Sequence, residues 1–221
     1  MVVFDMAGTT VDEHNLVYKT LRTAINEAGF NLDLEQVLAE GAGKEKKEAI
    51  RSILAVYGDR KDEVLIAGIY DRFIRQLTLA YASEDITPQN NATALFAALK
   101  ARNILRVLNT GYDRDTARHI VKKLGWTEGE EFDALITASD VPRNRPFPDM
   151  IDHARDKFGI ENSAQVIKVG DSAIDIEEGK NSGCGLSIGI TTGAHTPEQL
   201  RKADPDYIID DLIELVGIIE R

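Results

Sequence analysis

The sequence opens with MVVFDMAGTT at residues 1–10, a short apolar run that ends on an aspartate and continues into a glycine-containing loop. A short continuous apolar run bounded by turn residues is typical of a strand buried on both faces of a sheet. The pattern predicts a strand over residues 1–5 that ends on the carboxylate of Asp5, followed by a tight loop over residues 7–10.

Similar runs recur beyond residue 87, where they alternate with stretches of helical periodicity and are joined by short loops. The predicted strands cover residues 104–108, 134–136, 166–169, 186–190 and 207–209. The predicted helices cover residues 92–100, 114–124, 149–158, 173–181 and 211–219. Strands that alternate with helices in this way are typical of a doubly wound parallel sheet. We therefore expect an α/β fold with a Rossmann-like parallel sheet as its core.

Residues 14–84 differ, because their apolar side chains recur at helical spacing and no strand is apparent in the sequence. The predicted helices cover residues 14–28, 34–39, 44–56 and 66–80. A helical block that follows the first strand is typical of an insertion, so we expect an all-helical cap over residues 14–84. The core domain then comprises residues 1–13 and 85–221.

The composition limits the classes of function. The chain of 221 residues carries 26 basic and 37 acidic side chains, a net charge of −11. This acidic excess argues against nonspecific nucleic-acid binding and against docking on an anionic membrane. No apolar run approaches the ~20 residues of a membrane span, and the start lacks the basic region of a signal peptide. One cysteine, Cys184, rules out an internal disulfide, and four scattered histidines form no zinc motif. We expect a cytoplasmic protein.

Polar side chains follow the predicted strands at the edge where ligands bind in open α/β sheets. Asp5 ends the first strand, Thr110 lies in the loop NTGYD after the second, and Asp171 follows the fourth. Arg145 lies in the loop that leaves the third strand, and Asp175 lies one turn into the last of these helices. Each residue alone would fit an ordinary turn or helix cap. Together they predict phosphoryl transfer, with Asp5 as nucleophile, Mg²⁺ held by carboxylates, and Thr110 and Arg145 on the phosphoryl oxygens.

Four stretches resemble the motifs of the haloacid dehalogenase superfamily, and most closely those of its phosphonatase branch, over the whole chain. They are DMAGTTVD at 5–12, NTGYD at 109–113, NRPFPDM at 144–150 and KVGDSAIDIEEGKNSG at 168–183. The resemblance implies that Asp5 attacks phosphorus and forms an aspartyl-phosphate. It also implies that Thr110 binds the phosphoryl group and that Arg145 is the cation of the third motif.

The same resemblance implies a magnesium site and a set of substrate contacts. The Mg²⁺ ion would be held by Asp5, Asp171 and the backbone carbonyl of Ala7, with Asp175 as an acidic support of the metal. The expected substrate contacts in the core are Gly8, Gly111 and Tyr112. Members of the branch pair through their caps, so the resemblance allows a homodimer without fixing the oligomer.

Ala7 departs from most phosphatases of the superfamily, which carry at this position a second aspartate that protonates the leaving alkoxide. General acid–base assistance contributes about 10²–10⁴-fold in rate, so an ordinary phosphate monoester should be a poor substrate. The phosphonatase branch shares the alanine, the arginine at the position of Arg145 and the tyrosine at the position of Tyr112. Its leaving group is an enamine carbon, formed after a cap lysine condenses with the aldehyde of the substrate.

The cap stretch AGKEKKEAIRSI at 42–53 resembles the phosphonatase segment that carries this lysine. An ungapped match places Lys46 at the Schiff-base position, whereas Ala42 and Ala49 replace a methionine and a histidine of the family. The charged run GKEKKE also fits a solvated first helical turn. Two interpretations stay open: Lys46 or Lys44 forms the Schiff base, or these lysines only contact an anionic substrate.

The sequence as a whole predicts a Mg²⁺-dependent, phosphonatase-like hydrolase of a small phosphonate or phosphorylated substrate, with phosphonoacetaldehyde as the leading candidate. A phosphatase that acts on an activated phosphate, such as an acyl phosphate, is the alternative among enzymes. A non-catalytic phosphate-binding or regulatory protein is the alternative outside them. We expect neither a nucleic-acid partner nor a membrane partner.

Overall fold

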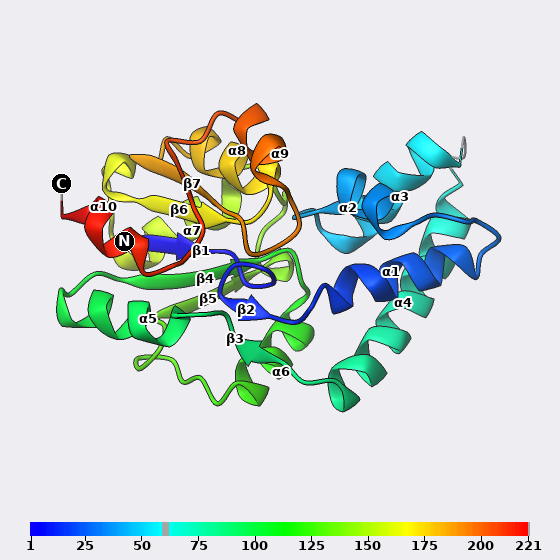
Figure 1. Cartoon of the computed structure of the whole chain (residues 1–221), viewed down its shortest axis with the longest axis horizontal. Coiled ribbons are helices and arrows are strands. Elements are labelled where there is room, and N and C mark those ends of the chain that lie inside the picture. The colour runs from blue at the N-terminus through cyan, green and yellow to red at the C-terminus, as the bar shows by residue number, and fades with distance from the viewer. Residues whose placement is uncertain (59–61, 221) are drawn as a thin grey trace.

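Six parallel strands form the main sheet of the computed structural model, which describes residues 1–58 and 62–220 (Figure 1). Their order across the sheet is β5-β4-β1-β6-β7-β8. The strands are β1 Val2–Phe4, β4 Arg106–Thr110, β5 Ala134–Thr137, β6 Ile167–Gly170, β7 Leu186–Ile190 and β8 Tyr207–Ile209. The chain builds one side of the central strand β1 through β4 and β5, and then the other side through β6, β7 and β8. Ligands of such sheets bind where the strand order reverses, beyond the carboxyl ends of the strands.

Helices cover both faces of this sheet (Figure 1). They are α5 Ala92–Ala101, α6 Arg114–Lys123, α7 Asp149–Phe158, α8 Ala173–Asn181, α9 Pro197–Lys202 and α10 Glu214–Ile219, with short 3₁₀ helices at Ala138–Asp140 and Ser163–Gln165. Successive side chains of β1 enter separate hydrophobic clusters: Phe4 packs with Phe96 at a ring-centroid distance of 5.6 Å, and Val3 lies in the cluster that contains Met150. Burial on both faces explains why β1 is apolar throughout.

Four further helices form the cap, which stands beside the sheet in Figure 1: α1 Leu16–Asn26, α2 Leu34–Gly41, α3 Lys46–Tyr57 and α4 Glu63–Ser83. Helices α1 and α4 pack together, and Val17, Leu21 and Ile25 are buried on α1 at helical spacing. Helix α3 begins after Glu45, whose carboxylate accepts hydrogen bonds from the first backbone amides of the helix. An aspartate caps each of the helices α2 and α4 in the same way.

A two-stranded antiparallel ribbon lies where the chain leaves the core and where it returns. The ribbon pairs β2 Val11–Asp12 with β3 Thr87–Pro88, and the amide of Gln89 donates to the carbonyl of Thr10 at 2.9 Å. The two crossings between core and cap therefore lie side by side. The division of the chain at residues 13 and 85 remains a prediction.

The predicted α/β fold with a Rossmann-like parallel sheet is confirmed. Strands 186–190 and 207–209 and helices 149–158 and 173–181 have the predicted bounds. The second strand was predicted two residues too early: β4 extends to Thr110, and Asn109 and Thr110 pair with β5 instead of forming a loop. The apolar run stops before Asn109, but the ladder continues because a buried carboxylate accepts from the side-chain amide of Asn109.

Three short elements were not predicted from the sequence: β2, β3 and α9 Pro197–Lys202. The ribbon strands have two residues each and α9 has six, so neither shows a periodic pattern. The bounds of two cap helices differ from the predicted ones. Helix α3 begins at Lys46 and not at residue 44, and α4 extends from Glu63 to Ser83 and not from residue 66 to 80. Among the described residues, no helix has the length and apolar character needed to cross a bilayer. Cys184 is a free, partly buried thiol.

Candidate active site

Three polar side chains meet at the carboxyl edge of the sheet. Asp5 follows β1, Thr110 ends β4, and Asp171 follows β6. Phe4 lies opposite both Leu108 and Val169, so Asp5 lies one residue short of the level of Thr110 and Asp171. Asp5 and Asp171 are only 5% and 4% exposed. The edge therefore holds two buried carboxylates close to a threonine hydroxyl.

Arg145 connects this edge to a buried network. Its Nη1 atom lies 2.7 Å from an oxygen of Asp5 and 3.0 Å from one of Asp175, and its Nε atom lies 3.0 Å from Glu178. Its Nη2 atom donates to the side-chain oxygen of Asn109 at 2.7 Å. Burial alone would lower the pKa of Arg145, but the surrounding carboxylates hold it well above the usual value. Arg145 is thus a fixed cation that touches the predicted nucleophile.

Lys168 is the second cation of this network, and its side chain is fully buried. Its Nζ atom lies 3.0 Å from Asp175, 3.2 Å from Glu178 and 2.6 Å from the side-chain oxygen of Asn109. Sequence reasoning missed Lys168 and Glu178. The available signals were a lysine inside an apolar strand and a glutamate three residues after Asp175, on the same face of α8.

Asp171 is held by the loop that follows β7. The amide of Ala194 donates to its Oδ2 atom at 2.6 Å. A Cβ atom on Gly193 would lie 1.9 Å from that oxygen, and one on Gly8, where φ is +80°, would lie 2.4 Å from it. Burial raises the pKa of Asp171 well above its usual value, and the charge of Asp5 raises it further. Gly8 therefore permits the backbone to approach Asp171 closely, a role that was not predicted for it.

The charges of the cluster suit a divalent cation. At their formal charges, four carboxylates and two cations leave two negative charges in excess; the groups are Asp5, Asp171, Asp175, Glu178, Arg145 and Lys168. The oxygens of Asp5, Asp171 and the Ala7 carbonyl are the hard donors that Mg²⁺ prefers. One oxygen of Asp175 lies 3.0 Å from both Arg145 and Lys168, and Ser172 donates a hydrogen bond to the other. Among the described residues, no group of three or more His, Cys, Asp or Glu side chains is arranged to hold a metal.

Lys46 is buried, so the interpretation of GKEKKE as a solvated turn is wrong for this residue. Its side chain lies on the face of α3 that also buries Ala49, Ile50 and Ile53, and only 7% of the residue is exposed. Burial lowers the pKa of Lys46, and the charge of Asp5 is the largest opposing influence. Lys46 is thus the buried member of this charged run, whereas Lys44, Glu45 and Lys47 are partly exposed.

The Lys46 amine lies at the boundary between cap and core. Its Nζ atom donates to the carbonyl of Lys44 at 2.9 Å, and it lies 5.1 Å from the ring centroid of Tyr18 and 5.4 Å from that of Tyr112. The Lys44 amine instead donates to Ser52 within the cap at 3.0 Å. Lys46 is thus the candidate lysine at this boundary, where the charge of Asp5 acts on its amine.

A cavity of about 310 Å³ opens beside Lys46, and Tyr112, Gly111 and Asn144 are among its lining residues. The cap loop closes tightly on the core next to it: a Cβ atom on Gly111 would lie 3.0 Å from the carbonyl oxygen of Lys44. Gly111 therefore permits the approach of the cap backbone. The volume of the cavity is at the lower end of the range of small-molecule pockets, and Asp5, Arg145 and Asp171 are not among its lining residues.

Glu13 is a further buried acid, and sequence reasoning missed it. It follows the ribbon strand β2, is 3% exposed, and accepts a hydrogen bond from the amide of Val17 at 2.7 Å. Burial raises the pKa of its carboxyl from the usual 4.5 to about 8, and the charge of Lys46 opposes this rise. The raised pKa thus favours the protonated form of Glu13 at neutral pH.

The raised pKa of Glu13 predicts a loss of stability with rising pH. Between pH 4.5 and pH 8 the folded state keeps a proton on Glu13 that the unfolded state has released, so the free energy of unfolding falls across this window. Glu13→Gln should remove that fall, at about 1.4 kcal/mol per unit of pKa difference. Urea unfolding at pH 5 and pH 9 tests this prediction. The variant should have a higher free energy of unfolding than the wild type only at pH 9, and an equal increase at both pH values would contradict the prediction.

The chain resembles known hydrolases over nearly its whole length. Residues 2–188 match the sequence profile described as haloacid dehalogenase-like hydrolase. The phosphonoacetaldehyde hydrolase of Latilactobacillus sakei is 28% identical, over 100% of this chain and 94% of that protein. A protein named probable phosphatase IndB, from Dickeya dadantii, is 27% identical, over 98% of this chain and 92% of its own length. The solved structure of a phosphonoacetaldehyde hydrolase-like protein from Oleispira antarctica covers 99% of this chain and 90% of its own, with a TM-score of 0.83 and 25% identity.

Proposed function

The chain belongs to the haloacid dehalogenase-like hydrolase family, and on this premise we propose that it hydrolyses the carbon–phosphorus bond of a small phosphonate aldehyde. The observation that carries the proposal is the buried Lys46 amine beside the cavity of about 310 Å³. Burial lowers the pKa of Lys46, which increases the fraction of neutral amine. A neutral amine is the form that attacks a carbonyl carbon.

The proposed reaction needs no acid at the position of Ala7. Lys46 condenses with the aldehyde, releases water and forms a protonated imine. When Asp5 attacks phosphorus, the electron pair of the carbon–phosphorus bond moves into the imine, and the carbon leaves as an enamine. An enamine needs no proton at that moment, in contrast to the alkoxide that leaves a phosphate monoester. The enamine then takes up a proton at carbon and is hydrolysed, which releases the dephosphorylated aldehyde and frees the Lys46 amine. Water also hydrolyses the aspartyl-phosphate.

The core residues bind and orient the phosphoryl group in this proposal. Arg145 stays beside Asp5, at 2.7 Å, and offsets the repulsion between that carboxylate and an anionic substrate. The Thr110 hydroxyl, at the carboxyl end of β4, donates to a phosphoryl oxygen in this proposal. Mg²⁺, held by Asp5, Asp171 and the Ala7 carbonyl, would supply the remaining positive charge when bound.

Lys46→Arg should lower phosphate release from phosphonoacetaldehyde by about 10³-fold or more, because a guanidinium keeps the positive charge but forms no imine. The measurement is inorganic phosphate released in the presence of Mg²⁺. Lys44→Arg is the matched control, because the Lys44 amine donates to Ser52 within the cap. This variant should lose far less activity. Equal losses in the two variants would contradict the assignment of the imine to Lys46.

A phosphatase acting on an activated phosphate is the second candidate, and Ala7 favours it. An acyl phosphate leaves as a carboxylate, which also departs without an acid. The identity shared with the probable phosphatase of Dickeya dadantii points the same way. Turnover of acetyl phosphate without phosphate release from phosphonoacetaldehyde would support this candidate over carbon–phosphorus cleavage.

A further inference from the structure

Three buried groups at the junction between cap and core have no part in the chemistry proposed above: Glu13, Tyr81 and Tyr112. Each is at most 3% exposed. The hydroxyls of Tyr81 and Tyr112 lie 2.7 Å apart, and either can donate to the other. The Glu13 carboxyl lies near Tyr81, because its charge contributes to the raised pKa of the Tyr81 hydroxyl. The three side chains thus lie next to one another in the junction, and each carries an exchangeable proton.

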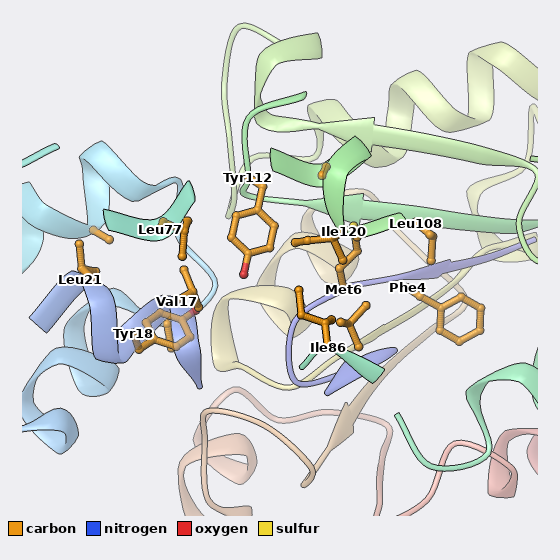
Figure 2. Close-up of a cluster of buried hydrophobic side chains, with 14 of the residues drawn as sticks. Phe4, Met6, Val17, Tyr18, Leu21, Leu77, Ile86, Leu108, Tyr112 and Ile120 are labelled. Carbon is orange, nitrogen blue, oxygen red and sulfur yellow. The ribbon is translucent and has the colours of Figure 1, made fainter. Parts of the chain in front are cut away.

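The chain of groups ends at the cavity beside Lys46. Tyr112 lines that cavity, and its ring lies 5.4 Å from the Lys46 amine. Figure 2 shows Tyr112 in the space between Leu77 and Val17 of the cap and Ile120 and Met6 of the core. The other end of the chain, Glu13, lies next to the ribbon strand β2 and is buried away from solvent.

Condensation at Lys46 needs a proton source that α3 does not provide. A neutral amine and an aldehyde give a protonated imine and water only if one proton is added. One turn after Lys46, on the same buried face of α3, stands Ala49, which cannot donate a proton. The proton must therefore come from a buried group outside α3.

We propose that Glu13, Tyr81 and Tyr112 form a proton relay that serves the condensation of Lys46 with the substrate aldehyde. The inference rests on the function proposed above. The amine nitrogen bonds to the carbonyl carbon, and the proton that the nitrogen loses and the proton that the oxygen gains pass through Tyr112 and Tyr81. In the dehydration step Glu13 releases one proton in total, the carbon–oxygen bond breaks, and water leaves with that proton. After the cleavage the enamine carbon takes up one proton, and hydrolysis of the resulting imine releases one. Hydrolysis of the aspartyl-phosphate releases a further proton, and this one restores Glu13.

The electrostatics of the junction fit this direction of transfer. Burial raises the pKa of Glu13 to about 8, so the proton is present at neutral pH. The groups whose charges act on Glu13 are Lys46, which favours its ionised form, and Asp12, which opposes it. Burial also raises the pKa of Tyr81 and Tyr112 well above the usual value, so both phenols pass a proton on without remaining ionised.

The test measures imine formation directly. Wild type, Glu13→Gln, Tyr81→Phe and the double variant are mixed with phosphonoacetaldehyde and sodium borohydride, and alkylation of Lys46 is followed by mass spectrometry. Each single variant should slow alkylation about 10²-fold at saturating substrate. The double variant should be no slower than the slower single variant, because both changes interrupt one chain. Tyr207→Phe, which removes a phenol from β8, is the control and should react at the wild-type rate.

Two further readouts separate a relay from a structural defect. Interruption of a relay lowers the rate at saturation and leaves the half-saturating substrate concentration unchanged, whereas distortion of the cavity raises that concentration. Urea unfolding at pH 7 verifies that each variant is folded. Alkylation at the wild-type rate in either single variant, or additive slowing in the double variant, would overturn the relay. Absence of alkylation in the wild type would instead overturn the proposed function, and the relay with it.

Discussion

Asp5→Asn is expected to abolish phosphate release, by about 10⁴-fold or more, in a protein that stays folded. An amide oxygen does not form the acyl phosphate that the proposed reaction requires. The fold should tolerate the change, because asparagine has nearly the same size and Arg145 keeps its 3.0 Å contacts with Asp175 and Glu178. The loss should therefore be chemical and not structural.

The Asp5→Asn experiment is read on two substrates. Phosphate release is measured from phosphonoacetaldehyde and from acetyl phosphate, and both should be lost, since the two candidate functions share the aspartyl-phosphate. Asp85→Asn, which changes an exposed aspartate near the ribbon, is the matched control and should keep wild-type rates. Activity that survives in Asp5→Asn on either substrate would exclude Asp5 as the nucleophile for that substrate.

Lys168→Met should lower the free energy of unfolding by about 3–5 kcal/mol, which is the usual result of removing one partner from a buried ion pair. The Lys168 amine touches Asp175, Glu178 and Asn109, and neither it nor the two carboxylates has any exposed side-chain surface. Without the lysine, Arg145 alone must balance the negative charge of the network. Methionine fills the space but supplies no charge.

Lys180→Met is the control for this stability prediction. Lys180 also makes a 3.0 Å ion pair, but its partner Asp204 has a 95% exposed side chain. Exposed ion pairs contribute about 0–1 kcal/mol, so this variant should unfold at nearly the wild-type urea concentration. A similar loss of unfolding free energy in both variants would mean that the buried ion pairs of Lys168 stabilise the fold no more than an exposed pair does.

The parts of the site that the sequence predicts are those carried by local pattern. Asp5 and Asp171 each follow a short apolar run, and in a parallel sheet all such runs end at one edge. Their approach thus follows from the order of strands and helices along the chain. The end of β4 was predicted two residues too early for a local reason as well: Asn109 is polar, which is typical of a loop, and yet it is buried in the sheet.

The parts that the sequence does not predict depend on contacts between distant segments. Glu178 bonds to Asn109, 69 positions away, and nothing in the surroundings of either residue indicates the other. Lys46 lies in a strongly charged run, and it is buried because of the orientation of α3 against the core. Glu13 becomes a protonated acid only when cap and core enclose it. Local patterns therefore locate the phosphoryl site, whereas the surroundings of Lys46 require the tertiary structure.

The ribbon of β2 and β3 makes the cap an exchangeable module. Because Val11 pairs with Pro88 and Asp12 with Thr87, the inserted segment begins and ends at neighbouring points. A turn of a few residues could join those points, and each doubling of the inserted length adds only about 0.6 kcal/mol of closure entropy. Insertions of very different size and sequence are therefore compatible with the same sheet. Selection can replace the segment that recognises the organic group while the chemistry at phosphorus stays intact.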